Sequence, residues 1–414
     1  MNADLTIRKA RLRSGRICDI AITGTQIHAI DEKSDTSPQN TIDAHGRLVT
    51  ETFVIAHLHL DKVMTGSLAE ETALTHYHGS SKSNAMTAVE LASKVKEHYV
   101  ESDIEQRVRR VLIDAEYYGV SHIRAFADVD NKTGLKGVKA LLKMKDEFRD
   151  RISIQIVAFP QDGIIREPGA EELLYKSMES GADIVGGIPW IEYTKKNSKK
   201  HIKIGFEIAK QFGADIAMLT DDAADPELRT TEYLATETIK NEWSGRVTAC
   251  HARSTALYNS AHHRKLVALL KKAGVSVVTN PHTGPLHVRV KQLLNAGVTV
   301  ALGQDDVYDA YYPYGRCNML EVAFLAGHLM WMMTREDREV LYDMITLNPA
   351  KIMKLADYGM APGKAANLVI LDAEDSRQAL ASHSEPLVVI RNGILRSETH
   401  SNRSRRNLAI RPSE

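Results

Sequence analysis

Short runs that alternate apolar and polar residues open the chain and predict β-strands. They lie at residues 4–12, 18–23, 25–31 and 41–49, and turns containing Gly15 and Gly24 separate the first three. Alternation with a period of two directs successive side chains to opposite faces of a sheet. Residues 1–50 are therefore expected to form a small β-structure.

From Ala88 onward, amphipathic helical segments alternate with short apolar runs, and many of the helical segments end at a glycine. Such repeated strand–helix units with buried strands indicate parallel pairing. Eight of them predict an α/β fold of the (β/α)₈ TIM-barrel type. A doubly wound open sheet is the competing fold, but no glycine-rich phosphate loop supports it. The eight apolar runs are residues 53–59, 122–128, 153–159, 182–188, 214–220, 246–251, 275–280 and 298–303.

The chain returns to β-rich sequence near its end. After helical patterns at residues 319–333 and 335–345, apolar strands recur at 366–372 and 387–398. We expect these strands to join those of the N-terminus, because both ends of the chain are strand-rich. The predicted domains are a composite β-sandwich from residues 1–50 and 360–400, a barrel catalytic domain from residues 51–359, and a mobile, polar and basic tail at residues 401–414.

Composition narrows the class of protein. The 53 Lys and Arg residues balance 53 Asp and Glu residues, so no overall positive charge is available to hold a nucleic acid. The 3 cysteines have no close spacing, which fits a reducing, cytoplasmic environment. No apolar run reaches the roughly 18 residues that would span a bilayer. The expected partner is a small molecule, and not a nucleic acid or a membrane.

Histidine and aspartate residues follow several of the predicted strands. His57 and His59 end the first strand, and residues two apart share one face of a strand. His251 ends the sixth strand, and Asp305 and Asp306 follow the eighth. The carboxyl ends of barrel strands form the mouth where active sites of this fold lie. Their convergence predicts a divalent metal site at this mouth.

Longer segments resemble a known family. They include VTETFVIAHLHLDK, IVAFPQDG, GRVTACH and ALGQDDVYDAYYPYGRCNML, and the similarity extends over nearly the whole chain. These segments are similar to the amidohydrolase superfamily, in the branch that contains cytosine deaminase and N-isopropylammelide amidohydrolase. The resemblance implies a (β/α)₈ barrel with a β-sandwich built from both chain ends. It also implies hydrolytic removal of an amino group from a nitrogen heterocycle at one Zn²⁺ or Fe²⁺, in a protein that forms homo-oligomers.

The resemblance also assigns roles to individual residues. A metal of this kind lowers the pKa of bound water from about 15.7 to about 7. The resulting hydroxide attacks the ring carbon that carries the amine, while a glutamate moves a proton to the ring nitrogen. The family's metal ligands match His57, His59 and Asp305, its water-orienting histidine matches His251, and its substrate-reading residues match Gln161, Asp306 and Tyr311.

The chain departs from the family at polar positions of the barrel mouth. Leu219 stands where the family has a metal-binding histidine, and Asp222 stands where it has the glutamate. Leucine has no lone pair, so one ligand is missing, and aspartate is one methylene shorter than glutamate. The other replacements are Phe126, Trp190 and Gln304 for histidines and Ile55 for an acid.

The remaining groups still predict a site. We expect His57, His59, Asp305 and His251 to hold one divalent metal, Zn or Fe. We expect Asp305, His251 and Asp222 to be catalytic. The predicted substrate contacts are Gln161, Asp306, Tyr311, Trp190 and Phe126, the last two either as a stacking wall or as apolar filling.

Three functions are compatible with this sequence. The first is a metal-dependent hydrolase that deaminates or cleaves a C–N bond of a small planar heterocycle such as a pyrimidine, triazine or pterin. The second is a divergent or metal-independent C–N bond enzyme, and the third is a non-catalytic heterocycle-binding relative. The vacancy at Leu219 supports the last two. Two further histidine pairs, His76 with His78 and His282 with His287, carry less weight in this prediction.

Overall fold

The computed structural model describes residues 3–32, 38–68 and 82–399. The predicted tail at residues 401–414 lies outside these ranges, as do His76 and His78.

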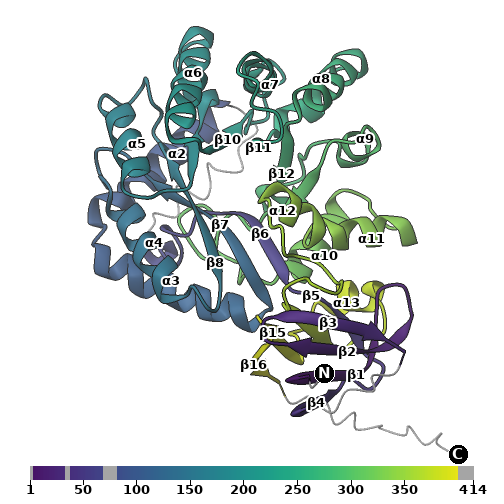
Figure 1. The fold of residues 1–414 in the computed structure, drawn as a ribbon. Helices are drawn as coiled ribbons and strands as arrows, with labels where there is room; N and C mark the ends of the chain where they lie inside the picture. Colours follow the sequence, from purple (N-terminus) through teal and green to yellow (C-terminus); the bar gives the residue numbers. More distant parts are fainter. Residues whose placement is uncertain (1–2, 33–37, 69–81, 400–414) are drawn as a thin grey trace, which may run out of the picture.

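Eight parallel strands form the sheet of the barrel, and they coincide with the eight apolar runs of the sequence (Figure 1). Their order in the sheet follows their order in the chain. Most of their residues are buried, because the strands are covered on the outside by helices and packed on the inside against one another. The strands are β6 (Phe53–Leu58), β7 (Val120–Asp128), β8 (Ser153–Phe159), β9 (Ile184–Gly187), β10 (Asp215–Thr220), β11 (Val247–His251), β12 (Ser276–Thr279) and β13 (Val300–Leu302).

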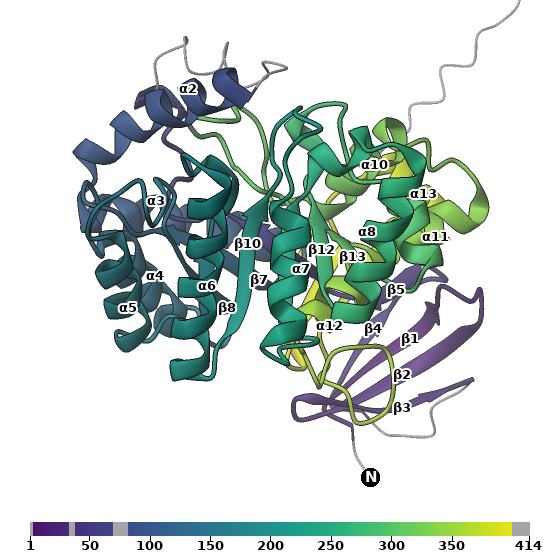
Figure 2. The same cartoon turned by 90° about the horizontal axis from the view of Figure 1, so that it is seen from above.

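Amphipathic helices connect successive strands and lie outside the barrel (Figure 2). In α6 the buried residues Ile202, Phe206 and Ala209 recur at helical spacing, which produces one apolar face. Gly213 ends this helix in the left-handed conformation, with φ +60°. The connecting helices are α3 (Glu101–Tyr117), α4 (Lys136–Glu147), α5 (Ala170–Glu179), α6 (Lys195–Phe212), α7 (Thr230–Lys240), α8 (Ser260–Ala273) and α9 (Val290–Asn295).

The barrel closes between its first strand and the segment that follows its last strand. Leu58 and Asp305 form a parallel bridge. The backbone N–H of Asp305 donates to the carbonyl oxygen of His57 at 2.9 Å, and the N–H of His59 donates to the carbonyl oxygen of Asp305 at 2.7 Å. Closure of the sheet therefore brings the histidine pair of one chain segment beside an aspartate almost 250 residues away.

Strands from both chain ends form the second sheet, which lies beside the barrel (Figure 1). β5 pairs antiparallel with β14, so the two ends join at the middle of this sheet. The predicted domain limits at residues 50 and 360 stay a prediction. The strands are β1 (Leu5–Arg11), β2 (Ile17–Thr23), β3 (Gln26–Asp31), β4 (Asn40–Asp43), β5 (Leu48–Glu51), β14 (Leu368–Leu371), β15 (Val388–Arg391) and β16 (Ile394–Glu398).

One predicted helix differs from the structure. The sequence predicted helix from residue 88 to 100, but α2 spans Lys82–Ser93 and a 3₁₀ segment, Lys94–His98, follows it. The change of helix type turns Lys96 inward, where its Nζ lies 2.7 Å from both Asp128 and Asp130. The remaining helices are α10 (Met319–Leu329), α11 (Arg335–Asp343), α12 (Leu347–Ile352) and α13 (Ser376–Ser382). Among the described residues, no helix combines the length and apolarity needed to cross a bilayer.

Gly119, in the turn before β7, links the barrel to the second sheet. It has φ +78°, and a Cβ added to it would lie 2.6 Å from Val369 Cγ1 of β14. We predict that Gly119→Ala lowers the free energy of unfolding by about 2–4 kcal/mol. About 1–2 kcal/mol comes from the positive φ, and the remainder comes from overpacking. Denaturant unfolding followed by circular dichroism measures this loss.

Gly213→Ala is the matched control, because Gly213 has φ +60° and no atom within 4 Å of an added Cβ. It should lose only the backbone contribution of about 1–2 kcal/mol. Equal losses in the two variants would show that Gly119 carries no packing constraint between the barrel and the second sheet.

Candidate functional site

A cavity opens at the carboxyl ends of the barrel strands. Ionisable side chains reach this cavity from the segment after β6, from β11 and from the segment after β13. Apolar side chains reach it from α2, from β10 and from the segment after β9. Its lining residues are His59, Lys62, Ala85, Val89, Gln161, Ile188, Trp190, Leu219, Asp222, His251, Asp305, Asp306 and Tyr311.

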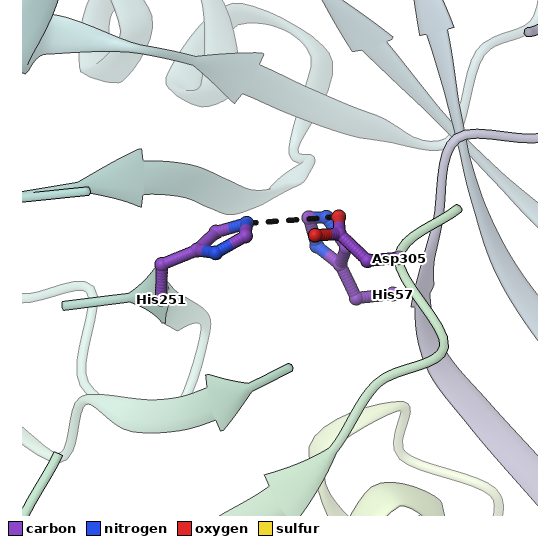
Figure 3. A group of neighbouring side chains, drawn as sticks. All are labelled: His57, His251 and Asp305. Atoms are coloured by element: carbon purple, nitrogen blue, oxygen red, sulfur yellow. Dashed lines mark ion pairs between the residues drawn. The ribbon is translucent and has the colours of Figure 1, made fainter. Parts of the chain in front are cut away.

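His57, His251 and Asp305 point toward one another from three separate parts of the barrel (Figure 3). Asp305 Oδ1 lies 2.8 Å from His57 Nε2 and 3.6 Å from His251 Nε2. One nitrogen or oxygen from each residue falls within 4.8 Å of the others, and all three side chains are buried. This spacing suits three ligands of one divalent cation.

His59 extends the same group. Its Nε2 lies 3.5 Å from Asp305 Oδ1, and His59, Asp305 and Asp306 also place ligand atoms within 4.8 Å of one another. The four predicted ligands, His57, His59, His251 and Asp305, are therefore brought together by the fold. That they bind a metal stays a prediction.

The donor set fits a divalent metal. Both ring nitrogens of His57 and Oδ1 of Asp305 are buried without a well-aligned hydrogen bond within the described part of the chain, although His57 Nε2 and Asp305 Oδ1 lie 2.8 Å apart. Buried polar atoms normally have a hydrogen-bond partner, so a cluster of such atoms needs an explanation such as an ion. Neutral imidazoles and a carboxylate are ligands that Zn²⁺ and Fe²⁺ accept.

The charge of Asp305 is well supported. Burial favours its neutral form, but the nearby His251 and His57 and a hydrogen bond from His282 outweigh burial and hold the pKa of Asp305 well below its usual value. His282 Nε2 lies 3.4 Å from both Asp305 Oδ2 and Asp306 Oδ2. Burial lowers the pKa of His282, yet these two carboxylates raise it to about 9. The site thus holds an ionised carboxylate beside a cationic imidazole in the absence of other ions.

The backbone is strained at two of these positions. His251 and Asp305 both have φ +65°, a left-handed conformation that costs a non-glycine residue about 1–2 kcal/mol. Strain of this kind is found at functional sites, where the surrounding structure enforces it. Here the strain turns both side chains into the barrel mouth at the ends of their strands.

Asp222 lies behind His251 and not at the centre of the group. Its Oδ1 accepts from Arg253 Nε at 2.6 Å and lies 3.3 Å from His251 Nδ1. A carboxylate on the far nitrogen of a histidine fixes which nitrogen keeps its lone pair. The geometry therefore favours a positioning role for Asp222 on His251, beside the predicted role in proton transfer.

The predicted substrate-contacting residues occupy different places. Gln161, Asp306, Tyr311 and Trp190 line the cavity. Phe126 is not among the lining residues; its ring packs 4.1 Å from the ring of His57. This position favours support of the histidine over stacking on a ligand. Trp190 Nε1 is buried with no hydrogen bond in the described chain, so a ligand acceptor could satisfy it.

Two polar residues of the site, and its aliphatic lining residues Ala85, Val89 and Ile188, were not predicted from the sequence. Lys62 lines the cavity, and its Nζ lies 2.5 Å from Gln161 Oε1. Asn280 Nδ2 lies 3.1 Å from His251 Nε2. Lys62 follows the histidine pair by three residues, and Asn280 ends the seventh predicted strand, so position at strand ends was the available signal for both.

Comparisons with known proteins agree with this architecture. The model of the Amidohydrolase family matches residues 40–393. N-isopropylammelide isopropyl amidohydrolase of Pseudomonas sp. (strain ADP) is 31% identical over 393 residues, which cover 94% of this chain and 96% of that protein.

Two solved structures are similar over nearly their whole lengths. 5-Methylcytosine deaminase from Klebsiella pneumoniae, liganded with phosphonocytosine, superposes with a TM-score of 0.87 at 31% identity, covering 95% of this chain and 98% of that one. N-isopropylammelide isopropylaminohydrolase from Burkholderia multivorans gives a TM-score of 0.84 at 25% identity, with the same coverage. The family match extends over most of the chain and includes the barrel with its histidine and aspartate cluster. The chain belongs to the amidohydrolase family.

Proposed function

We propose that this chain hydrolyses an exocyclic C–N bond of a small planar nitrogen heterocycle, with one divalent metal held by His57, His59, His251 and Asp305. The observation that carries the proposal is the buried cluster itself. It combines an ionised carboxylate, the imidazole of His57 with no well-aligned hydrogen bond in the described chain, and strained backbone, all at the mouth of the barrel. Burying an ionised carboxylate costs several kcal/mol in desolvation even when it is paired, and the strained backbone adds to this cost, so a structural role alone does not explain the cluster.

When bound, such a metal supplies a hydroxide near neutral pH by lowering the pKa of its water. The residues of the chain do the remaining work. Asp305, held ionised by its neighbours, would serve both as the carboxylate ligand and as the proton acceptor of the site. His251 faces the same point, and Asp222 holds its Nδ1 side. Asp306 lines the cavity beside Asp305 and can accept from a ring N–H or from the leaving amine.

The apolar part of the cavity favours a substituted amine as the leaving group. Leu219, Ile188, Trp190, Ala85 and Val89 contribute this surface. A free amino group would leave it facing water, whereas burying each methylene of an alkyl substituent is worth about 0.8 kcal/mol. Two of the relatives are named for an isopropyl-substituted ammelide, which supports an N-alkylated heterocycle as substrate.

A metal-free function on the same scaffold is the second candidate, and Leu219 supports it by taking the place of a family ligand. Its place on β10, lining the cavity with His251 and Asp305, is compatible with a weakened metal site as well as with a lost one. We also propose a cytoplasmic homo-oligomer, on the strength of the sequence resemblance.

Metal content distinguishes these functions. We predict that the purified protein binds close to one Zn or Fe per chain. His57→Ala should remove it together with amine release from an N-alkylamino-triazine, because His57 Nε2 and Asp305 Oδ1 face each other at 2.8 Å. Elemental mass spectrometry and an amine assay measure the two effects. His262→Ala, on α8 and outside the cluster, is the control and should change neither. Folded protein that takes up neither ion would refute the metal-dependent function.

Leu219→His should strengthen metal binding. Leu219 lines the same cavity as His251 and Asp305, so an imidazole there adds a fourth nitrogen donor near the cluster. We expect at least a tenfold rise in affinity, about 1.4 kcal/mol, measured by competition with a chelator. Leu219→Phe is the control for changed volume, and it should not tighten binding. An unchanged affinity in Leu219→His would mean that the four groups are not arranged around a metal.

A further inference from the structure

Lys62 is a buried cation at the wall of the cavity. Its side chain is 4% exposed, and its Nζ contacts Gln161 Oε1 at 2.5 Å, Asp128 Oδ1 at 3.1 Å and His59 Nδ1 at 3.2 Å. Asp128 is shared, because Lys96 Nζ lies 2.7 Å from its other oxygen. Asp128 is therefore only one of three contacts of Lys62, and the shortest of the three is with the predicted substrate-reading glutamine.

The contact with Lys62 fixes the orientation of Gln161. An ammonium group has three donors and no acceptor, so it must face the amide oxygen and not the amide nitrogen. Gln161 lines the cavity, and its NH₂ group is then the end left for a ligand. Gln161 can therefore offer a ligand only a hydrogen-bond donor, although a free glutamine side chain could offer both a donor and an acceptor.

Metal binding by His59 would release a further donor. A histidine that ligates through Nε2 carries its proton on Nδ1, and that nitrogen cannot accept a hydrogen bond. The N–H of Lys62 that faces His59 Nδ1 in the described structure then needs another acceptor. An oxygen atom of a ligand in the cavity is suitably placed to supply it, because Lys62 lines the cavity.

The other polar side of the cavity has the opposite character. Asp305 and Asp306 contribute carboxylate oxygens to its lining. One side therefore offers acceptors to ring N–H groups or amines, and the side formed by Lys62 and Gln161, which we call the donor wall, offers only donors.

We propose that Lys62 is a substrate-recognition residue and that the donor wall selects heterocycles carrying a ring oxygen, as a carbonyl or an ionised hydroxyl, over rings carrying an amino group at that edge. This inference rests on the proposed function only in taking the ligand to be a planar heterocycle. An amino group facing the donor wall would place donors against donors and leave one N–H of Lys62 without an acceptor, whereas an oxygen accepts from both residues.

Two symmetric triazines test this directly. Cyanuric acid carries an oxygen on every ring carbon and melamine carries an amino group on every ring carbon, so the orientation of either ring in the cavity does not matter. Calorimetric titration of the Zn²⁺-loaded protein should give at least tenfold tighter binding of cyanuric acid. Lys62→Met, which keeps the length of the side chain, should weaken cyanuric acid binding tenfold or more and change melamine binding less than twofold.

Two further variants complete the design. Lys132→Met removes a nearby cation that lies 3.7 Å from Asp162 and does not line the cavity, and it should leave both affinities unchanged. Gln161→Glu replaces the amide donor by an acceptor of the same shape, so it should weaken cyanuric acid and strengthen melamine. This variant and the wild-type preference decide the question if Lys62→Met does not fold.

A wild type that binds both rings equally or prefers melamine overturns the inference, and so does a Lys62→Met variant that weakens both rings alike. Binding is measured apart from turnover, so the two proposals can fail separately. A clear preference for cyanuric acid in a protein that releases no amine supports the donor wall and contradicts the proposed hydrolysis. Amine release without that preference contradicts the donor wall alone.

Discussion

The site depends on the hydrogen bonds that close the barrel. The backbone of His57 at the end of β6 and of His59 just after it pairs with Asp305 after β13, which holds these three residues together. Because the hydrogen bonds involve the main chain of the same residues whose side chains cluster, the distances within the cluster are set by the geometry of strand pairing. Loosening the closure would separate the carboxylate from both histidines at once.

Much of this arrangement follows from the sequence because it depends on periodic patterns. Eight apolar runs between amphipathic helices predicted the strands at nearly their observed positions, and the position of His57, His251 and Asp305 at strand ends predicted their convergence. The donor wall was not predicted, because it depends on pairing between side chains of separate elements. Nothing local in the sequence shows that Lys62 reaches Gln161, that Lys96 reaches Asp128, or that Arg253 takes up Asp222.

The roles of single residues at the barrel mouth also depend on contacts with other elements, which the sequence does not show. The sequence predicts only that Asp222 carries a proton with a shorter reach than glutamate. In the structure, Arg253 and His251 both contact its carboxylate, which indicates a role in positioning His251. For Phe126 the sequence left two roles open, a stacking wall or apolar filling, and its packing against the ring of His57 favours the second. In both cases the residue lies against a histidine of the predicted metal site and supports its position.

Leu219 changes two properties of the cavity together. The resemblance implies that Leu219 stands in place of a metal-binding histidine, and the absence of that nitrogen donor is expected to cost about 1.4 kcal/mol of metal affinity or more. Leu219 also contributes apolar surface to the wall that Trp190 and Ile188 form. Burying a three-carbon substituent there is worth about 2 kcal/mol, at roughly 0.8 kcal/mol per carbon. The two effects are similar in size, so weaker metal binding can be offset by tighter binding of an N-alkylated substrate. A protein that had lost its activity would gain nothing from burying an ionised carboxylate beside two imidazoles. Burial of such a charge costs several kcal/mol. The retained cluster therefore favours a change of substrate over a loss of function.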